Sequence, residues 1–245
     1  MDLARYYAGY PVFSLRLNRV RRMLYRPLLR RLRRDGFGPG CTLLDYGCGG
    51  GAFVHYLREK GYFGAEGYDP YAPAEGFGDP RALDKGPFEY VLLQDVVEHV
   101  QDPAALLSEV NRYAAAGGYV LVGTPDAGRI DLARPERHVN ELHLPYHRHI
   151  LTREALESMG QRVGWRPVRF YERAYHDCPW LGLNSRAVKV YQSLMDGTVD
   201  SLGEPIRAGR ALRSGRFLFA AFVGYFFRYK GEMAVMFRRA RSWAR

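Results

Sequence analysis

Two acidic residues and a glycine-rich stretch carry the clearest chemical signal in this sequence. Asp45 is followed by Tyr46-Gly47-Cys48-Gly49-Gly50-Gly51, and Asp69 ends the next apolar segment. A glycine loop between a strand and a helix exposes backbone N–H groups at the positive end of the helix. Glycine also lets the chain turn tightly and approach a ligand closely. The pattern therefore predicts a site for a nucleotide-like cofactor.

The acid in front of the glycines distinguishes between cofactors. A dinucleotide loop has the spacing G-x-G-x-x-G, whereas this loop reads D-x-G-x-G-x-G. A carboxylate there would repel a pyrophosphate, but it suits the ammonium and sulfonium end of S-adenosylmethionine. Asp69 then stands where it can accept the hydroxyl protons of a ribose diol. We predict S-adenosylmethionine, with S-adenosylhomocysteine as the product; a structural turn and a nicotinamide cofactor are the alternatives.

Histidines are the candidate bases. Imidazole is the side chain best matched to proton removal near neutral pH. His99 follows the strand expected at 88–94. Four more histidines lie in a short segment after the strand expected at 119–124: His138, His143, His147 and His149. We expect the catalytic base among His99, His143 and His147; the alternative is that they cap helices or pack a loop. Pro145 excludes one regular helix through the segment, and zinc is not expected there.

Short apolar runs alternate with helical patterns from Cys41 onward, and these elements must position the groups above. Such repeated strand–helix units predict an α/β fold with a doubly wound, mostly parallel, Rossmann-like sheet. The stretch between Asp69 and Phe88 is poor in pattern, so one unit is expected to be shortened. Strands are expected at 42–45, 63–69, 88–94, 119–124, 165–172 and 232–238, and helices at 52–60, 103–115 and 152–163, the last capped by Thr152.

The flanks are expected to be helical. Residues 14–34 show apolar residues at helical spacing with arginines between them, and Pro27 predicts a kink or two shorter helices. Residues 1–40 are thus expected to form basic amphipathic helices that act as a lid or face a membrane. Residues 41–245 form the cofactor-binding domain, with 173–230 as a less regular substrate-side insertion. Within it, 183–195 and 203–222 are expected to be helices before the last strand.

Three segments resemble class I S-adenosylmethionine-dependent methyltransferases of the small-molecule group. Residues 93–103 are similar to its "LEHVxDP" segment, residues 117–126 to its "pGGxLxxxTPN" hairpin, and residues 147–165 to the helix that follows. The resemblance covers about 43–172 and is strongest to quinone O-methyltransferases. It implies a Rossmann-like fold and cofactor contacts from Asp45, Gly47, Cys48, Gly49, Gly51, Asp69, Pro70, Gln94, Asp95 and Val96. Asp79 is a candidate for the adenine-binding acid.

In quinone O-methyltransferases, a carboxylate-x-x-Glu-His group is associated with a divalent metal. Asp95, Glu98 and His99 match that spacing and would share one face of a helical turn. Asp95 is shorter than the Glu found there, and we therefore expect no metal ligand in this chain.

Basic residues gather at the two ends of the chain, which has a net charge of +10. Nine arginines lie in residues 16–34 without an acid, and a second basic group lies in residues 207–245 with Glu232 as its one acid. This distribution predicts a local anionic partner, which could be a membrane surface, nucleic acid or an acidic substrate. The apolar segment 217–230 is too short to span a bilayer; we favour a core helix, with a membrane-facing surface as the alternative.

The remaining features favour a cytoplasmic protein, with the inner face of the membrane as an open location. The first residues are not expected to form a secretory signal, and Cys41, Cys48 and Cys178 show no paired spacing, which favours a reducing compartment. Aromatic residues are not concentrated within the arginine-rich helix for base stacking, so nucleic acid is disfavoured.

We therefore predict a methyltransferase acting on a small, apolar, lipid- or quinone-like acceptor, with O-methylation ahead of N- or C-methylation. An RNA methyltransferase and a non-catalytic cofactor-binding protein are the alternatives. The oligomeric state stays open.

Overall fold

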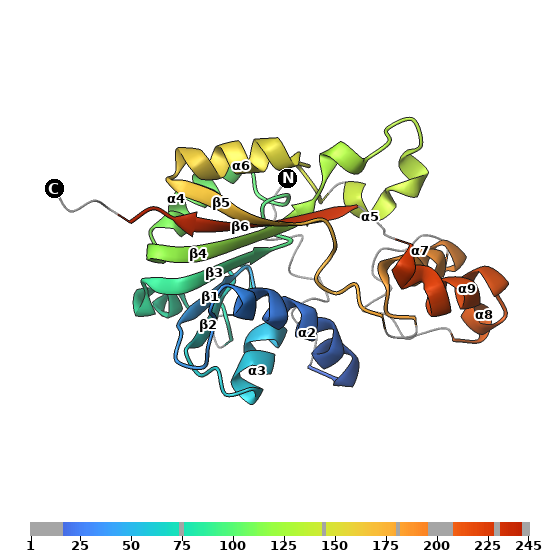
Figure 1. The fold of residues 1–245 in the computed structure, drawn as a ribbon, viewed down its shortest axis with the longest axis horizontal. Helices are drawn as coiled ribbons and strands as arrows, with labels where there is room; N and C mark the ends of the chain where they lie inside the picture. Colours follow the sequence, from blue (N-terminus) through green and yellow to red (C-terminus); the bar gives the residue numbers. More distant parts are fainter. Residues whose placement is uncertain are drawn as a thin grey trace.

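A six-stranded sheet forms the centre of the molecule (Figure 1). The computed structural model describes residues 17–73, 76–143, 146–179, 182–195, 208–227 and 231–241. The strand order is β2-β1-β3-β4-β6-β5; the pairs β1–β2, β1–β3 and β3–β4 are parallel, and β6 runs antiparallel to β4 and β5. The predicted doubly wound, mostly parallel α/β sheet is confirmed. The strands are β1 (Leu43–Tyr46), β2 (Ala65–Tyr68), β3 (Phe88–Gln94), β4 (Ala114–Pro125), β5 (Trp165–Tyr171) and β6 (Glu232–Arg239).

Helices cover both faces of this sheet, which is why its central strands are apolar on both sides. On one face lie α2 (Arg19–Arg34) and α3 (Ala52–Glu59), which bury Leu28, Leu32 and Leu57 against it. On the other lie α4 (Pro103–Asn111) and α6 (Arg153–Arg162), which bury Leu107 and Leu156. Figure 1 shows the two layers of helices on either side of the strands.

Two boundaries differ in how well the pattern predicted them. Thr152 caps α6 as expected, because its side chain accepts a hydrogen bond from the Ala155 N–H at 3.2 Å. The expected helix 103–115 is too long and ends at Asn111. Ala114 already pairs with Phe88 in the sheet, so tertiary pairing overrides the helical preference of the alanines.

The unit between β2 and β3 is shortened, as predicted. Its described residues hold the 3-10 helix η2 (Pro80–Lys85) and no strand. The chain therefore reaches β3 directly after β2, and the strand that would flank β2 in a longer sheet is missing from the described part of the molecule.

The arginine-rich helix α2 is continuous through Pro27, so the expected division into two shorter helices is wrong within residues 19–34. Proline removes one hydrogen bond from the helix, but Leu28, Leu29 and Leu32 are buried in the core just beyond it. The apolar stripe of α2 thus packs on the sheet and α3. Arg26, Arg30, Arg33 and Arg34 are exposed, whereas Arg31 is buried. The expected residues 14–16 of this helix lie outside the described residues.

A group of short helices lies beyond the carboxyl ends of the parallel strands (Figure 1). The helix expected at 183–195 is present as α7. The helix expected at 203–222 is divided into α8 and α9. Ser214 caps the start of α9, because its hydroxyl oxygen accepts a hydrogen bond from the Phe217 N–H at 3.2 Å. Residues 196–207 lie outside the described residues. The group comprises α5 (Val139–Leu142), α7 (Ser185–Leu194), α8 (Ala208–Leu212), α9 (Gly215–Val223) and the 3-10 turn η5 (Gly224–Phe226); η3 (Ala127–Arg129) and η4 (Pro135–Arg137) precede it.

Candidate active site

The glycine loop connects β1 to α3 in backbone conformations that favour glycine. Gly47, Gly49 and Gly51 have φ angles of 80°, 55° and 67°, in the left-handed region that other residues rarely adopt. The Gly47 N–H donates to the Tyr68 carbonyl at 2.7 Å, and the Gly51 N–H donates to the Cys48 carbonyl at 2.9 Å. The loop is thus fixed at the carboxyl edge of the sheet.

Phe77 explains why Gly51 and Gly67 have no room for a side chain. A Cβ on Gly51 would lie 1.8 Å from Cε2 of Phe77, and one on Gly67 would lie 2.7 Å from its Cδ1. The ring therefore packs directly against the loop and β2. Sequence reasoning missed Phe77, because it lies in the patternless stretch after Asp69.

Asp69 fastens the loop to the end of β2. Its Oδ2 accepts from the Gly49 N–H and its Oδ1 from the Tyr71 N–H, both at 2.9 Å. Burial raises its pKa. Each carboxylate oxygen keeps a further lone pair, so the group can still accept from the two hydroxyls of a ribose. The neighbouring Pro70 is exposed.

Asp45 is a buried carboxylate in need of a cation. Its exposed fraction is 7%, and burial together with the Asp69 carboxylate raises its pKa to about 7. None of the described residues donates a hydrogen bond to it or forms an ion pair with it. Burying a carboxylate without a partner is unfavourable, and the α-ammonium group of S-adenosylmethionine would supply one. The residues present therefore fit this cofactor.

The end of β3 meets the glycine loop through Val96. A Cβ on Gly47 would lie 2.4 Å from Cγ2 of Val96, so this valine packs on the loop. The Gln94 side chain lies on Gly123, where a Cβ would meet its Oε1 at 2.3 Å. Cys48 is half-buried, and burial with the nearby carboxylates raises its pKa, which keeps the thiol protonated.

Asp95 turns away from the helical turn expected at residues 95–99. Its φ angle of 55° is left-handed, and its N–H donates to the Gly123 carbonyl at 3.0 Å. The prediction that Asp95, Glu98 and His99 share one face of a helical turn is therefore wrong for Asp95. A residue in the left-handed region cannot continue a right-handed turn. Its carboxylate interacts electrostatically with Glu232 and His176 instead.

Asp95, His176 and Glu232 form an acidic group that sequence reasoning missed. The Nε2 of His176 lies 3.9 Å from Oε1 of Glu232. Desolvation by the surrounding protein and neighbouring acids raise the pKa of Asp95 and of Glu232 to about 7, and desolvation lowers that of His176. Solvent still reaches the group, because Asp95 is exposed and the Glu232 side chain exposes 32% of its surface. Glu232 begins β6 opposite Pro125. Since β6 is antiparallel, its first residue lies at the same edge as the ends of β3 and β4.

The three predicted histidines come together. The rings of His99 and His147 are 4.7 Å apart, and those of His143 and His147 are 5.1 Å apart. Nδ1 of His147 lies 2.6 Å from the Glu141 carbonyl, and Nδ1 of His99 lies 3.3 Å from the Tyr146 carbonyl. Burial lowers the pKa of His99 to about 3 and that of His147 to about 4. Both rings are therefore neutral and only weakly basic.

The other residues considered in the sequence have structural roles. Nε2 of His138 accepts from the Asp131 N–H at 3.1 Å, and Nε2 of His149 lies 3.0 Å from the Gln101 carbonyl. Asp79 caps η2 and pairs with Arg81, which occupies its carboxylate. These contacts hold loops around the site.

Glu98, His99 and His147 are placed so that they could hold a metal ion. Their ligand atoms all lie within 4.8 Å of one another. Oε2 of Glu98 accepts from the Thr124 hydroxyl at 3.1 Å, and its Oε1 is buried without a hydrogen-bond partner. Asp95, the third member of the group expected from the sequence, is not part of this arrangement.

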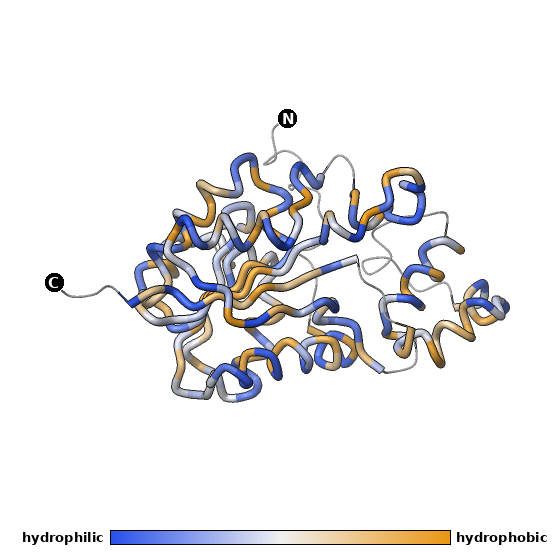
Figure 2. The backbone as a smooth tube through the Cα atoms, turned by 45° about the horizontal axis from the view of Figure 1, so that its top comes forward, coloured by the Kyte–Doolittle hydropathy of each residue, from blue (hydrophilic) through white to orange (hydrophobic). Residues whose placement is uncertain are grey.

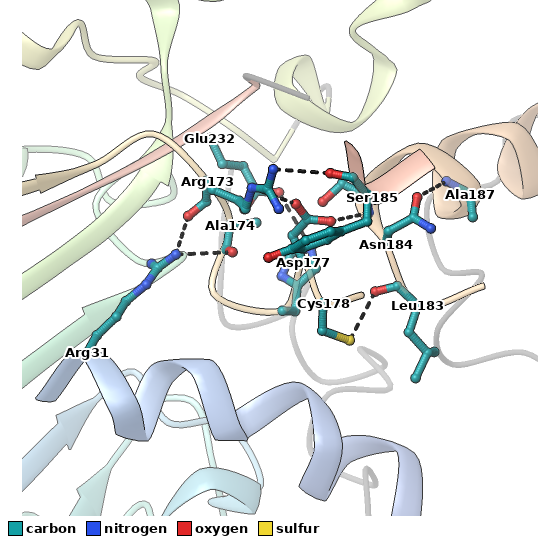
Figure 3. A network of polar contacts seen from close by, with 12 residues as sticks. Arg31, Arg173, Ala174, Asp177, Cys178, Leu183, Asn184, Ser185, Ala187 and Glu232 are labelled. Carbon is teal, nitrogen blue, oxygen red and sulfur yellow. Dashed lines mark hydrogen bonds and ion pairs between the residues drawn. The ribbon is translucent and has the colours of Figure 1, made fainter. Parts of the chain in front are cut away.

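The N-terminal helix α2 contacts the segment that follows β5. Tyr25 stacks on Tyr175 with ring centroids 6.3 Å apart. Burial and, to a smaller extent, the Asp45 carboxylate raise the pKa of Tyr25 to about 12. Arg31 donates to the carbonyls of Arg173 and Ala174, as Figure 3 shows. Tyr175 is also within electrostatic range of Asp45 and Asp95. Tyr175 is thus close to both the loop and the acidic group, and Tyr25 is close to the loop.

Known proteins resemble this chain in sequence and in fold. A family model described as a methyltransferase domain matches residues 17–169. A ubiquinone biosynthesis O-methyltransferase from Caulobacter sp. (strain K31) is 35% identical over 122 aligned residues, which cover 39% of this chain and 47% of the relative. The chain therefore spans about half the length of the curated relatives it matches.

Two solved structures show the same fold. A methyltransferase from Archaeoglobus fulgidus, described as dependent on S-adenosylmethionine, has a TM-score of 0.50 at 17% identity and covers 86% of this chain and 93% of its own. A phosphoethanolamine N-methyltransferase 2 from Haemonchus contortus, in complex with phosphomonomethylethanolamine and S-adenosylhomocysteine, has a TM-score of 0.51 at 15% identity, covering 87% of this chain and 52% of its own. At these identities the likeness concerns the fold alone.

Proposed function

We propose that this chain, which belongs to the methyltransferase-domain family and has the class I fold of S-adenosylmethionine-dependent methyltransferases, transfers a methyl group to a small apolar acceptor. The observation that carries the proposal is the unpaired, buried carboxylate of Asp45 beside a glycine loop that Asp69 holds in place. In this arrangement Asp45 is available to the ammonium group of S-adenosylmethionine and Asp69 to its ribose hydroxyls.

The proposed cofactor contacts are as follows. Asp45 would bind the ammonium group, the backbone of the loop would approach the methionine part, and Asp69 with Pro70 would hold the ribose. Bound S-adenosylmethionine supplies a methyl group on a positively charged sulfur. The protein contributes position, because an in-line displacement requires the acceptor atom to lie opposite the sulfur. The full set is Asp45, Gly47, Cys48, Gly49, Gly51, Asp69, Pro70, Gln94, Asp95 and Val96.

The acceptor's proton passes to the group of Asp95, His176 and Glu232. Its two carboxylates, Asp95 and Glu232, have a pKa of about 7, which is the range best suited to a general base at neutral pH. His99 and His147 are weaker bases, because burial holds their pKa values at about 3 and 4. We therefore propose Glu232 as the base, with His176 beside it. We propose that His99, His143 and His147 line the acceptor site without acting as the base.

An oxygen acceptor on a flat, apolar molecule suits these surroundings. A hydroxyl must lose a proton during transfer, whereas a neutral amine already has a free lone pair. The facing rings of Tyr25 and Tyr175 favour a flat acceptor. The similarity to a ubiquinone biosynthesis O-methyltransferase supports the same class. We propose α2, which carries Tyr25, as the lid over this site.

Transfer of radiolabelled methyl groups from S-adenosylmethionine tests the proposal. We expect label in alkyl-substituted catechols and hydroquinones, little in matched anilines, and none in transfer or ribosomal RNA. Label in RNA with a steep salt dependence would favour the RNA methyltransferase. Tight cofactor binding without turnover on every acceptor would favour a non-catalytic protein. A parallel reaction with a chelator shows whether the Glu98–His99–His147 group requires a metal.

A further inference from the structure

The helices α7, α8 and α9 form a small unit with an inverted distribution of apolar residues. Its core consists of alanines: Ala187 from α7 and Ala220 and Ala221 from α9 are buried against one another. Gly224 allows the close approach, since a Cβ there would lie 2.4 Å from Oδ1 of Asn184. The small residues of α9 and η5 therefore face the protein.

The large residues of the same elements face outward. Phe222 and Phe226 expose 66% and 77% of their surface. The interpretation of this segment as a core helix is therefore wrong for Phe222 and Phe226, whereas Phe217 packs against the alanines. Phe219 and Phe222 are three residues apart in α9 and therefore share a face, and Phe226 follows in η5. We call the exposed set the phenylalanine face: Leu212, Leu218, Phe219, Phe222, Phe226 and Phe227.

Arginines surround the phenylalanine face. Arg213 and Arg216 precede it in the chain and are exposed, as is Arg186, whose guanidinium lies 5.0 Å from the ring of Phe227. The sequence contains no acid between Glu204 and Glu232, and the described residues of α7 hold none either. Figure 2 shows apolar stretches beside hydrophilic ones in this unit, at the end of the molecule away from the C-terminus.

We propose that the phenylalanine face docks on an anionic lipid bilayer, with its rings in the acyl boundary and its arginines among the headgroups. Exposed aromatics bordered by arginine are the pattern of an interfacial helix, whose binding grows with apolar area and anionic lipid. No helix among the described residues is long and apolar enough to cross a membrane. The surface is thus peripheral.

A second copy of the chain fits this face less well. Two copies meeting there would bring Arg213 and Arg216 close to the same arginines of the partner, without an acid in the described unit to compensate. Like charges at the edge of an interface disfavour association. An anionic membrane supplies the missing countercharge.

The docked surface is joined to the proposed site by polar contacts. Arg173 donates to the Tyr225 carbonyl of η5 at 3.2 Å and pairs with Asp177 at 3.1 Å. Arg31 of α2 binds the carbonyls of Arg173 and Ala174 (Figure 3). The same turn carries Tyr175 and His176. An acceptor dissolved in the bilayer would therefore enter beside the acidic group; this last step rests on the proposed function, whereas the docking itself does not.

Flotation with liposomes tests the docking without cofactor or acceptor. Full-length protein is mixed with vesicles of phosphatidylcholine alone or with about 30% phosphatidylglycerol, a level at which arginines gain affinity. We expect recovery with the anionic vesicles only. Phe222→Ser with Phe226→Ser should lower the partition coefficient about tenfold or more, since two rings leave the acyl boundary.

Controls separate docking from folding and from self-association. Phe63→Ser removes another highly exposed phenylalanine, in the turn before β2, and should leave the partition unchanged. All variants should keep the thermal midpoint of the parent. Equal flotation of the double variant, or no recovery with anionic vesicles, would overturn the proposal. So would a dimer in sedimentation that the double variant abolishes, because the face would then bind a second copy.

Discussion

Tyr25 of α2 stacks on Tyr175 of the segment after β5, with an angle of 12° between the ring planes. This contact joins the two parts of the chain that flank the sheet. Both rings also lie within electrostatic range of Asp45, so the contact is close to the proposed cofactor site.

The ring pair should be energetically coupled. In a double-mutant cycle with Tyr25→Leu and Tyr175→Leu, we expect a coupling free energy of roughly 0.5–1.5 kcal/mol in unfolding, as for aromatic pairs generally. Chemical denaturation measures it. Each single variant should also weaken cofactor binding; strictly additive unfolding energies would show that the contact is incidental.

Cofactor affinity should rise with pH between 5.5 and 7. The pKa of Asp45 is about 7 in the free protein, so its carboxylate ionises across this range, while an α-ammonium group stays charged. A single group of this kind gives a gain of about tenfold or more in the association constant. Calorimetric titrations at several pH values measure it. Asp45→Asn should bind weakly at every pH, and an unchanged slope in this variant would assign the effect elsewhere.

Much of this site could be predicted from local sequence. The glycine loop, Asp69 and residues 94–96 occur beside short, strongly apolar strands, so the pattern alone brings them to one sheet edge. His176 and Glu232 could not be found in that way. Their place depends on β6 running antiparallel, which reverses the edge at which its first residue lies, and on a loop with no repeating pattern. The exposure of Phe222 was equally hidden, because composition does not show which side of a helix is covered.

Gly51→Ala should destabilise the protein more than Gly61→Ala. Both glycines have positive φ angles, 67° and 86°, but only Gly51 faces Phe77; around Gly61 there is open space. Gly61→Ala measures the backbone cost alone, about 1 kcal/mol, whereas Gly51→Ala adds overpacking of roughly 1–3 kcal/mol. Denaturant unfolding compares them. Equal losses would mean that Phe77 moves away freely.

The rate of methyl transfer should depend on Glu232 through its ionisation. With a pKa of about 7, the carboxylate is protonated in acid, so kcat should fall below pH 7 and level off above it. Glu232→Gln should lower kcat by roughly 100-fold and abolish the decrease of kcat below pH 7, which we call the acidic limb of the pH profile. His147→Asn should keep the limb, because the pKa of His147 is about 4. A limb that survives in Glu232→Gln and disappears in His147→Asn would place the base at the histidines.

The most direct test of the account is isothermal titration of S-adenosylmethionine into the parent protein and three variants. Asp45→Ala and Asp69→Ala each remove one of the two carboxylates that hold the cofactor, and we expect binding to be lost in both. Asp79→Ala removes a half-buried carboxylate that caps η2 and should bind like the parent. Unchanged affinity in both Asp45→Ala and Asp69→Ala would contradict the assignment of the cofactor to this loop.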